Sequence, residues 1–179
     1  MLAKIEKIDR FILLFTQNKI RLRKLNYLMK FITMLGDYGG VWLLISGGLL
    51  LSRKTRKVAI LSFISLILCY LVNNIIIKNV VHRKRPFNQY EDIEELVKKP
   101  KDYSFPSGHT CGSFAAAGIY IRFLHGKIAR FSILLASIIG YSRIYVGVHY
   151  PSDVVIGGMI GILGSQSIYY MYRFLSKKD

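Results

Sequence analysis

The sequence predicts an all-α polytopic membrane protein, a bundle of about five transmembrane helices with an amphipathic interfacial helix at its N-terminus. Hydrophobic residues make up 52% of the 179 positions, and they lie in long blocks instead of alternating with polar residues. The 26 Lys and Arg residues, against ten Asp and Glu, give a formal net charge of +16. Most of these cations lie at the ends of the apolar blocks, where they would meet lipid headgroups. This placement favours an anionic membrane, and not a nucleic acid, as the partner.

The N-terminal segment, residues 1–24, is expected to lie on the membrane surface, and residues 25–179 to form the helical bundle of the same single domain. Residues 4–17 place apolar side chains on one face of a helix and charged side chains on the other. Their apolar stretch is too short, and too close to charges, for a signal peptide, so an interfacial helix is the expectation. The apolar face comprises Ile5, Ile8, Phe11, Ile12 and Phe15, and the charged face Lys4, Glu6, Lys7, Asp9 and Arg10.

Five apolar blocks follow, each close to the roughly 20 residues that a helix needs to cross about 30 Å of hydrocarbon. They cover residues 31–51, 58–79, 107–125, 128–145 and 151–174. A long polar segment, residues 82–105, joins the second block to the third. Counting the crossings places the end of the second span, the start of the third, and the junction of the fourth and fifth on one side of the membrane. Three short motifs occupy these three places.

The first motif pairs Lys78 with Arg85 at the end of the second span. A spacing of seven residues is about two helical turns, so both side chains would share one face of the emerging helix. Pro86 disfavours helical geometry at Arg85, and the helix is expected to end there. Taken alone, Lys78 could simply reach the membrane interface with its charged end. Arg83 and Lys84 lie off this face and are expected to be interfacial cations.

The second motif, Pro106-Ser107-Gly108-His109, opens the third span. Ser107 is a candidate N-cap, and Gly108 leaves the first backbone N–H groups uncovered. A helix N-terminus with free amides and the positive end of the helix dipole is suited to bind an anion. A lone histidine is more often structural, but His109 beside such an anion site is a candidate general acid.

The third motif places Ser142-Arg143 at the end of the fourth span and His149 and Asp153 at the start of the fifth. Pro151 suits the first position of a helix, so Asp153 would lie in the first turn. Its carboxylate could then accept a hydrogen bond from one ring nitrogen of His149 and leave the other nitrogen as a nucleophile. In isolation, a His and an Asp this close could also be only a helix-cap contact.

The three motifs together resemble the signature of the type-2 phosphatidic acid phosphatase superfamily, and every signature position is occupied. This superfamily includes lipid phosphate phosphatases, bacterial undecaprenyl-diphosphatases and vanadium haloperoxidases. The resemblance implies that His149 attacks phosphorus to form a phosphohistidine, that Asp153 orients it, and that His109 protonates the leaving oxygen and later activates water. It also implies that no metal or other cofactor takes part. The residues implied to hold the phosphoryl oxygens are Lys78, Arg85, Ser107, Gly108 and Arg143.

The resemblance implies an anionic phosphorylated lipid as the substrate, with hydrolysis of undecaprenyl diphosphate to undecaprenyl phosphate as the leading expectation. Phosphatidylglycerophosphate, phosphatidic acid and lipid A phosphates are the alternatives. The five apolar blocks argue against a soluble haloperoxidase, and the intact signature argues against a lipid-binding scaffold without turnover. The sequence carries no signal for an oligomeric state.

The expected location is a bacterial plasma membrane, with the active site on the outer face. Residues 82–105 are too polar for the lipid interior, so they should lie over that outer surface. There the lysines of this segment could contact a second phosphate, although a solvated linker would have the same composition. These lysines are Lys98, Lys99 and Lys101.

Overall fold

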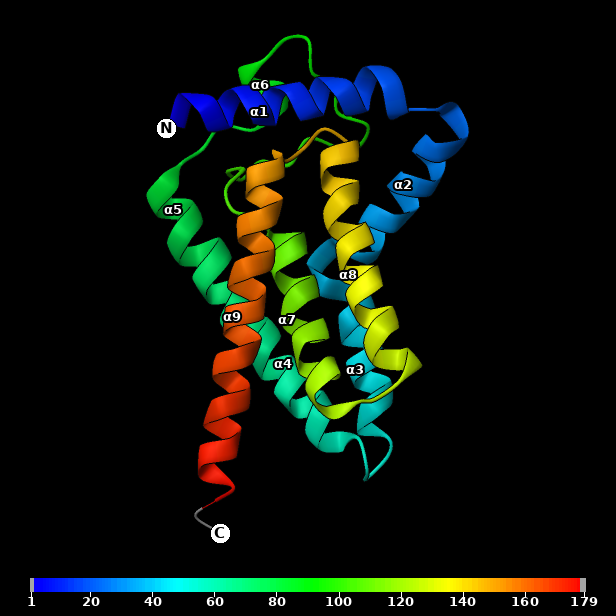
Figure 1. Ribbon diagram of the computed structural model, residues 1–179, viewed down its shortest axis with the longest axis vertical. Coiled ribbons are helices and arrows are strands. Elements are labelled where there is room, and N and C mark those ends of the chain that lie inside the picture. Colours follow the sequence, from blue (N-terminus) through cyan, green and yellow to red (C-terminus); the bar gives the residue numbers. More distant parts are fainter. Residues whose placement is uncertain (1, 178–179) are drawn as a thin grey trace.

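The computed structural model describes residues 2–177, and within them it contains helices and no strands. The helices form a bundle along the long axis of the molecule, and α1 lies across one end of it (Figure 1). The central helix, α7, packs against α4, α8 and α9. The α-helices are α1 (Leu2–Phe15), α2 (Arg23–Leu35), α3 (Gly40–Leu50), α4 (Arg56–Tyr70), α5 (Lys78–Val81), α6 (Pro86–Gln89), α7 (Gly108–Phe123), α8 (Lys127–Tyr145) and α9 (Pro151–Leu175). Thus the expected all-α membrane bundle is confirmed.

The expected five straight spans are only partly present among the described residues. By length and composition three helices can cross a membrane, and a bent pair makes a fourth if it counts as one span. The three are Arg56–Gln89, Lys127–Tyr145 and Pro151–Leu175, and the pair is Arg23–Leu35 with Asp37–Leu50 at an angle of 53°. The remaining expected span, the third one at residues 107–125, corresponds to α7, which has 16 residues, fewer than a straight crossing needs. Its neighbours enclose it on several sides, so it need not match the full hydrocarbon thickness.

The first expected span, residues 31–51, is wrong as a single helix because the chain breaks at Gly36. A 3₁₀ turn (Asp37–Gly39) follows, in which Tyr38 and Gly39 have positive φ angles of 53° and 72°. Gly36 packs against the ring of His109, and a Cβ atom there would lie 2.7 Å from the ring Cδ2. A side chain at this position would therefore collide with His109, and the bend brings Asp37 toward the motifs.

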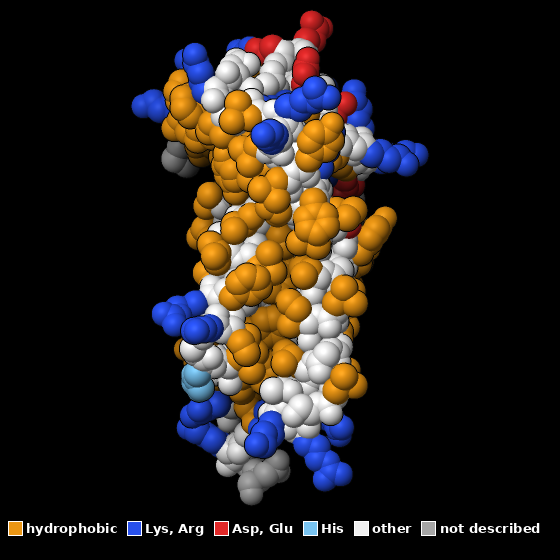
Figure 2. Space-filling view, turned by 90° about the vertical axis from the view of Figure 1, so that its right-hand side faces the viewer, with side chains coloured by type: hydrophobic (Ala, Val, Ile, Leu, Met, Phe, Trp, Pro, Cys, Tyr) orange, Lys and Arg blue, Asp and Glu red, His pale blue; other side chains and the backbone are white. Residues whose placement is uncertain are grey.

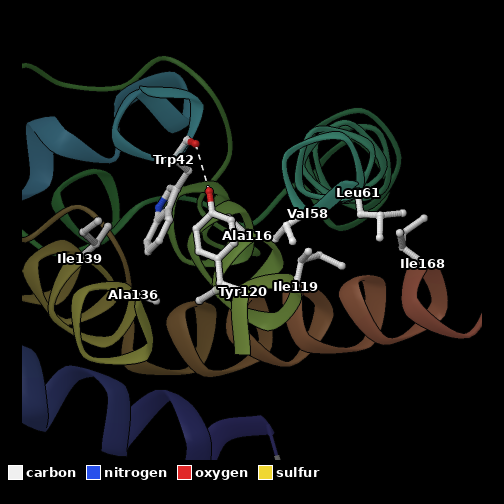
Figure 3. Packing of buried hydrophobic residues seen from close by; sticks show 10 residues of the cluster. Trp42, Val58, Leu61, Ala116, Ile119, Tyr120, Ala136, Ile139 and Ile168 are labelled. Carbon is white, nitrogen blue, oxygen red and sulfur yellow. Dashed lines mark hydrogen bonds between the residues drawn. The ribbon is translucent and has the colours of Figure 1, made fainter. Parts of the chain in front are cut away.

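Tight packing around α7 holds the bundle together. Trp42 of α3 is fully buried against Tyr120 of α7, as Figure 3 shows. Its indole N–H donates to the hydroxyl of Ser113 over 2.9 Å, so the polar atom of this large side chain is satisfied within the core. On the other side of α7, the backbone of α9 approaches so closely that a Cβ atom at Gly161 would lie 2.3 Å from the carbonyl oxygen of Cys111. Such close approach of small residues is typical of helix packing in membranes.

The surface has the pattern of a membrane protein. Hydrophobic side chains cover the middle of the face in Figure 2, while Lys and Arg gather toward the two ends. All three motifs lie at the end of the bundle that α1 covers, as the counting of crossings predicted. The turn between α3 and α4 and the turn between α7 and α8 lie at the opposite end (Figure 1).

The N-terminal helix has the expected position but not the expected charged face. Ile8 and Phe11 are exposed, as suits a helix that faces lipid at the membrane surface. Asp9, however, was expected among exposed charges and is only 2% exposed. Its carboxylate pairs with Arg83, so this part of the charged face meets the bundle and not water.

We expect Gly161→Ala to lower the free energy of unfolding by about 1–3 kcal/mol, the usual range for overpacking. The control is Gly48→Ala in α3, where nothing lies within 4 Å of the added methyl group. This control should be neutral or gain up to about 1 kcal/mol from helix propensity. Thermal unfolding in detergent measures both variants. Equal unfolding temperatures for both would contradict the close packing of α7 and α9.

Candidate active site

The three motifs converge into one buried cluster of charged groups. Lys78, Arg85, Arg143, His149 and Asp153 are each no more than 5% exposed. The site is therefore shielded from bulk water. Electrostatic interactions inside it are stronger than they would be at the surface. The structure brings together all the residues that the motifs predicted.

The first motif reaches the site by a different backbone path from the one expected. Helix α5 ends at Val81, and His82 takes a left-handed conformation with φ at 52°. Arg85 is extended and precedes α6, so Lys78 and Arg85 do not share a helical face as predicted. A turn between them, and not helical periodicity, brings both cations to the same place.

A carboxylate that the sequence analysis did not single out lies between these two cations. Asp102, near the end of the polar segment 82–105, forms ion pairs with Lys78 and with Arg85, the latter at 2.6 Å. Burial alone would raise the pKa of Asp102, but the hydrogen bond and charge of Lys78, with those of Arg85, hold the pKa well below its usual range. The two cations that were expected to hold phosphoryl oxygens thus hold a carboxylate here. Only the position of Asp102, five residues before Ser107, could have suggested this role.

His149 lies between a cation and a carboxylate. Arg85 Nη1 donates to Nε2 of His149 over 3.2 Å, and Nδ1 of the ring donates to Asp153 Oδ2 over 3.4 Å. Burial, followed by the charges of Arg85 and Arg143, holds the pKa of His149 well below its ordinary value. Because a guanidinium can only donate, Nε2 accepts with its lone pair, and the ring proton lies on Nδ1 toward Asp153.

The second motif forms the expected helix N-terminus. The Ser107 hydroxyl accepts from the backbone N–H of Thr110 over 3.4 Å, which confirms the N-cap. Gly108 packs against the side chain of Asn74, and a Cβ atom there would lie 2.8 Å from its Oδ1. Any residue other than glycine would therefore displace Asn74, so Gly108 allows α7 to begin beside the end of the second span.

The ring of His109 is oriented from the break between α2 and α3. Its Nε2 donates to Asp37 Oδ1 over 2.8 Å. Asp37 is the second acidic residue that the sequence analysis did not assign to the site. The bend at Gly36 makes this contact possible, and no local spacing connects residues that lie 72 positions apart.

Arg143 enters the site from the end of α8. Its Nη1 donates to the hydroxyl of Thr33, while its buried Nε has no hydrogen-bond partner among the described residues. A buried hydrogen-bond donor without a partner lowers the stability of the protein. An anion bound beside Arg143 would accept a hydrogen bond from this Nε. Arg143 is thus placed as a third cation for an anionic group.

The position of Arg83 also differs from the expectation of an interfacial cation. Its side chain is 22% exposed and forms ion pairs with Asp9 and Asp153. Arg83 therefore belongs to the surroundings of His149, and no periodicity in the sequence points to this.

The arrangement is suited to transfer of a phosphoryl group. It combines a neutral imidazole that can attack, a carboxylate that can stabilise the charge which then develops, and three cations for the phosphoryl oxygens. Within residues 2–177 no group of three or more His, Cys, Asp or Glu side chains is placed to hold a metal ion.

Comparison with known proteins gives a consistent result. The model of the PAP2 superfamily matches residues 58–177. An undecaprenyl-diphosphatase of Sulfolobus acidocaldarius is 34% identical over 145 residues, which cover 80% of this chain and 69% of that protein. The chain spans about half the length of several other curated relatives, which include lipid A 4'-phosphatases.

Two solved structures resemble the whole bundle. LpxE of Aquifex aeolicus superposes with a TM-score of 0.78 and 28% identity, over 92% of this chain and 93% of that one. A transmembrane PAP2 type phosphatidylglycerolphosphate phosphatase of Bacillus subtilis gives a TM-score of 0.73 and 27% identity, over 96% and 86%.

Replacing Asp102 by Asn removes the negative charge that occupies Lys78 and Arg85. We expect inorganic phosphate to bind about tenfold more tightly to this variant, a gain of about 1.4 kcal/mol. Because the pKa of Asp102 lies well below its usual range, the gain should stay constant between about pH 5 and pH 8. Isothermal titration calorimetry measures it.

The matched control is Asp92→Asn, which removes a carboxylate of the same segment that pairs with Arg10. It should leave phosphate binding unchanged. Weaker binding to Asp102→Asn would show that the carboxylate positions the cations and does not compete with the anion.

Proposed function

Because this chain belongs to the PAP2 superfamily, whose model covers residues 58–177, we propose that its buried cluster is the active site of a membrane lipid phosphatase acting through a phosphohistidine. The chain is a multi-pass membrane hydrolase of lipid phosphate esters or diphosphates, as its phosphatase relatives and helical bundle indicate. The observation that supports this mechanism best is the placement of the His149 ring, with Nε2 turned to Arg85 and Nδ1 to Asp153.

In the proposed mechanism, the phosphoryl group of the lipid displaces Asp102 from Lys78 and Arg85. Nε2 of His149 attacks phosphorus, and the bond between phosphorus and the leaving oxygen breaks. Asp153 stabilises the positive ring that forms. The buried cations stabilise the negative charge of the transition state.

His109 acts as the general acid and then as the general base. Its proton passes to the leaving oxygen in the first step. In the second step His109 takes a proton from water, which attacks the phosphohistidine and releases inorganic phosphate. The hydrogen bond to Asp37 fixes the direction of the ring.

Undecaprenyl diphosphate is the substrate that we favour. The relative of Sulfolobus acidocaldarius, which carries this activity in its name, matches over 80% of this chain. The segment 82–105 is packed against the rest of the protein through Ile93 and Ser104, which are buried, and we propose that its lysines contact the second phosphate. It is therefore not a free linker: Asp102 on it pairs with Lys78 and Arg85. Lys98 and Lys101 are exposed on it, and the exposed Lys99 pairs with Glu95. Phosphatidylglycerophosphate, phosphatidic acid and lipid A phosphates are the alternatives.

We place the active site on the outer face of a bacterial plasma membrane. The opposite end of the bundle carries cations in its turns and C-terminal tail, and several cations of the active-site end are accounted for by the site itself, so we take the opposite end as the cytoplasmic side. These cations are Arg53, Lys54, Arg56, Lys57, Lys127, Arg130, Arg173 and Lys177.

Phosphate release by the purified chain from the four phosphorylated lipids tests the function and the substrate together. We expect the highest kcat/KM with undecaprenyl diphosphate. His149→Ala should reduce kcat at least about 1,000-fold, the scale for loss of a nucleophile. His125→Ala, at the opposite end, is the control and should keep full activity. If His149→Ala released phosphate at the rate of this control, His149 would not be the nucleophile.

His109→Ala should affect substrates according to their leaving groups. An alkyl phosphate, whose leaving oxygen needs a proton, should lose about 100-fold or more in kcat. For an aryl phosphate with an acidic phenol, the reduction in kcat should be at least tenfold smaller, because its leaving oxygen is stable without a proton. Comparing kcat for the two substrates measures this. Equal losses would mean that His109 is not the general acid.

A further inference from the structure

Arg83 joins two carboxylates that come from opposite ends of the sequence. Nη1 donates to Asp153 Oδ1 over 2.6 Å, and Nη2 donates to Asp9 Oδ2 over 2.7 Å. The guanidinium also lies over the ring of Tyr150, with 3.8 Å between Cζ and the ring centroid. A planar group with two donating arms, fixed by an aromatic ring, is suited to hold two carboxylates at a set separation. We call this arrangement the Asp9–Arg83–Asp153 bridge.

The bridge connects the interfacial helix to the first turn of α9. Asp9 belongs to α1 and lies outside the residues that the family model covers. Besides Arg83, it accepts hydrogen bonds from the backbone N–H and the hydroxyl of Ser152, the former over 2.9 Å. Burying an ionised carboxylate costs free energy of desolvation unless the carboxylate is paired. The pairing of Asp9 is complete, and its partners lie next to the site.

The Asp153 carboxylate is held more firmly by these surroundings than by His149. It accepts from Arg83 over 2.6 Å and from the Ser104 hydroxyl over 2.5 Å, while the contact to Nδ1 of His149 is 3.4 Å long. The direction in which Asp153 points therefore depends on the groups behind it. The backbone of Arg83 supports the same arrangement, because its carbonyl oxygen accepts from the N–H of Ser104.

We propose that Asp9 and Arg83 are positioning residues, through which the interfacial helix α1 holds the Asp153 carboxylate ionised and directed at His149. The proposal rests on the proposed function of His149 as the nucleophile. Neither Asp9 nor Arg83 contacts the three cations that would bind phosphate, so the bridge acts on the rate of attack and not on substrate affinity.

The charges of the bridge predict unequal effects for its two ends. Without Arg83, the buried carboxylates of Asp9 and Asp153 lose the cation that joins them. One of them then takes up a proton or turns away, and a protonated Asp153 cannot stabilise the positive ring of His149. Without the charge of Asp9, Arg83 still pairs with Asp153. Removing the charges of both Arg83 and Asp9 leaves Asp153 without a second carboxylate in the bridge. The repulsion between the two carboxylates is then gone.

The experiment compares Arg83→Gln, Asp9→Asn and the double variant, with kcat and KM for phosphate release as the readout. Arg83→Gln should lower kcat about 100-fold with KM unchanged, and Asp9→Asn should lower it only about threefold. The double variant should be about tenfold faster than Arg83→Gln alone, a non-additivity typical of residues in one network. Arg83→Lys keeps the charge but loses one arm, so it should fall between the parent chain and Arg83→Gln.

The control is Asp92→Asn, which breaks the exposed ion pair that joins Arg10 of the same helix to the segment 82–105. It should keep kcat within about twofold of the parent chain, as is usual for exposed pairs. A kcat of Arg83→Gln equal to that of this control would overturn the proposal, as would a double variant no faster than Arg83→Gln. A rise in KM with kcat unchanged would mean that Arg83 binds substrate. If Arg83→Gln does not fold, Arg83→Lys decides, and an unchanged kcat there overturns the bridge.

A second readout separates the bridge from the proposed function. The chain has four histidines, so ¹⁵N labelling of histidine resolves the ring of His149 by nuclear magnetic resonance. The parent chain should show the proton on Nδ1, and Arg83→Gln should shift it toward Nε2. No phosphate release from the parent chain on any of the lipids would overturn the proposed function alone. An unchanged ring proton in Arg83→Gln would overturn the bridge alone.

Discussion

The constraint on which the rest of the structure depends is the neutralisation of cations that are buried at one end of a membrane bundle. Lys78, Arg85 and Arg143 lie together with little access to water, and uncompensated charges in such surroundings cost several kcal/mol each. The chain has ten acidic residues in all, and four of them serve this end of the bundle. They are Asp9, Asp37, Asp102 and Asp153, each paired with a cation or a histidine of the site.

Each of these four carboxylates arrives on a different element. Asp9 comes from α1, Asp37 from the break between α2 and α3, Asp102 from the polar segment, and Asp153 from α9. Three parts of the fold that lie outside the helices of the three motifs therefore contact the site through charged side chains. The interfacial helix, the bend at Gly36 and the segment 82–105 each bring one carboxylate to the groups of the site.

The sequence predicted those parts of the site that depend on local spacing or on the number of crossings. Ser107 caps α7 because Pro106 and Gly108 surround it, and Asp153 faces His149 because four residues separate them at a helix start. The parts that were missed depend on contacts between distant residues. Periodicity correctly assigned Asp9 to the charged face of α1, but it cannot show whether that face meets water or a second charged surface.

The carboxylate of Asp102 affects the energetics of substrate binding, because it occupies the cations that are proposed to bind the phosphate. In the proposed mechanism, Asp102 already pairs with Lys78 and Arg85, so entry of a lipid phosphate exchanges one negative group for another. The affinity that this mechanism predicts reflects a difference between two anions and not the full attraction of the cations. In the same mechanism the exchange runs in reverse after cleavage, and return of the Asp102 carboxylate to Lys78 and Arg85 competes with inorganic phosphate for these cations. A site with enough positive charge to stabilise the transition state thereby avoids being blocked by its own product.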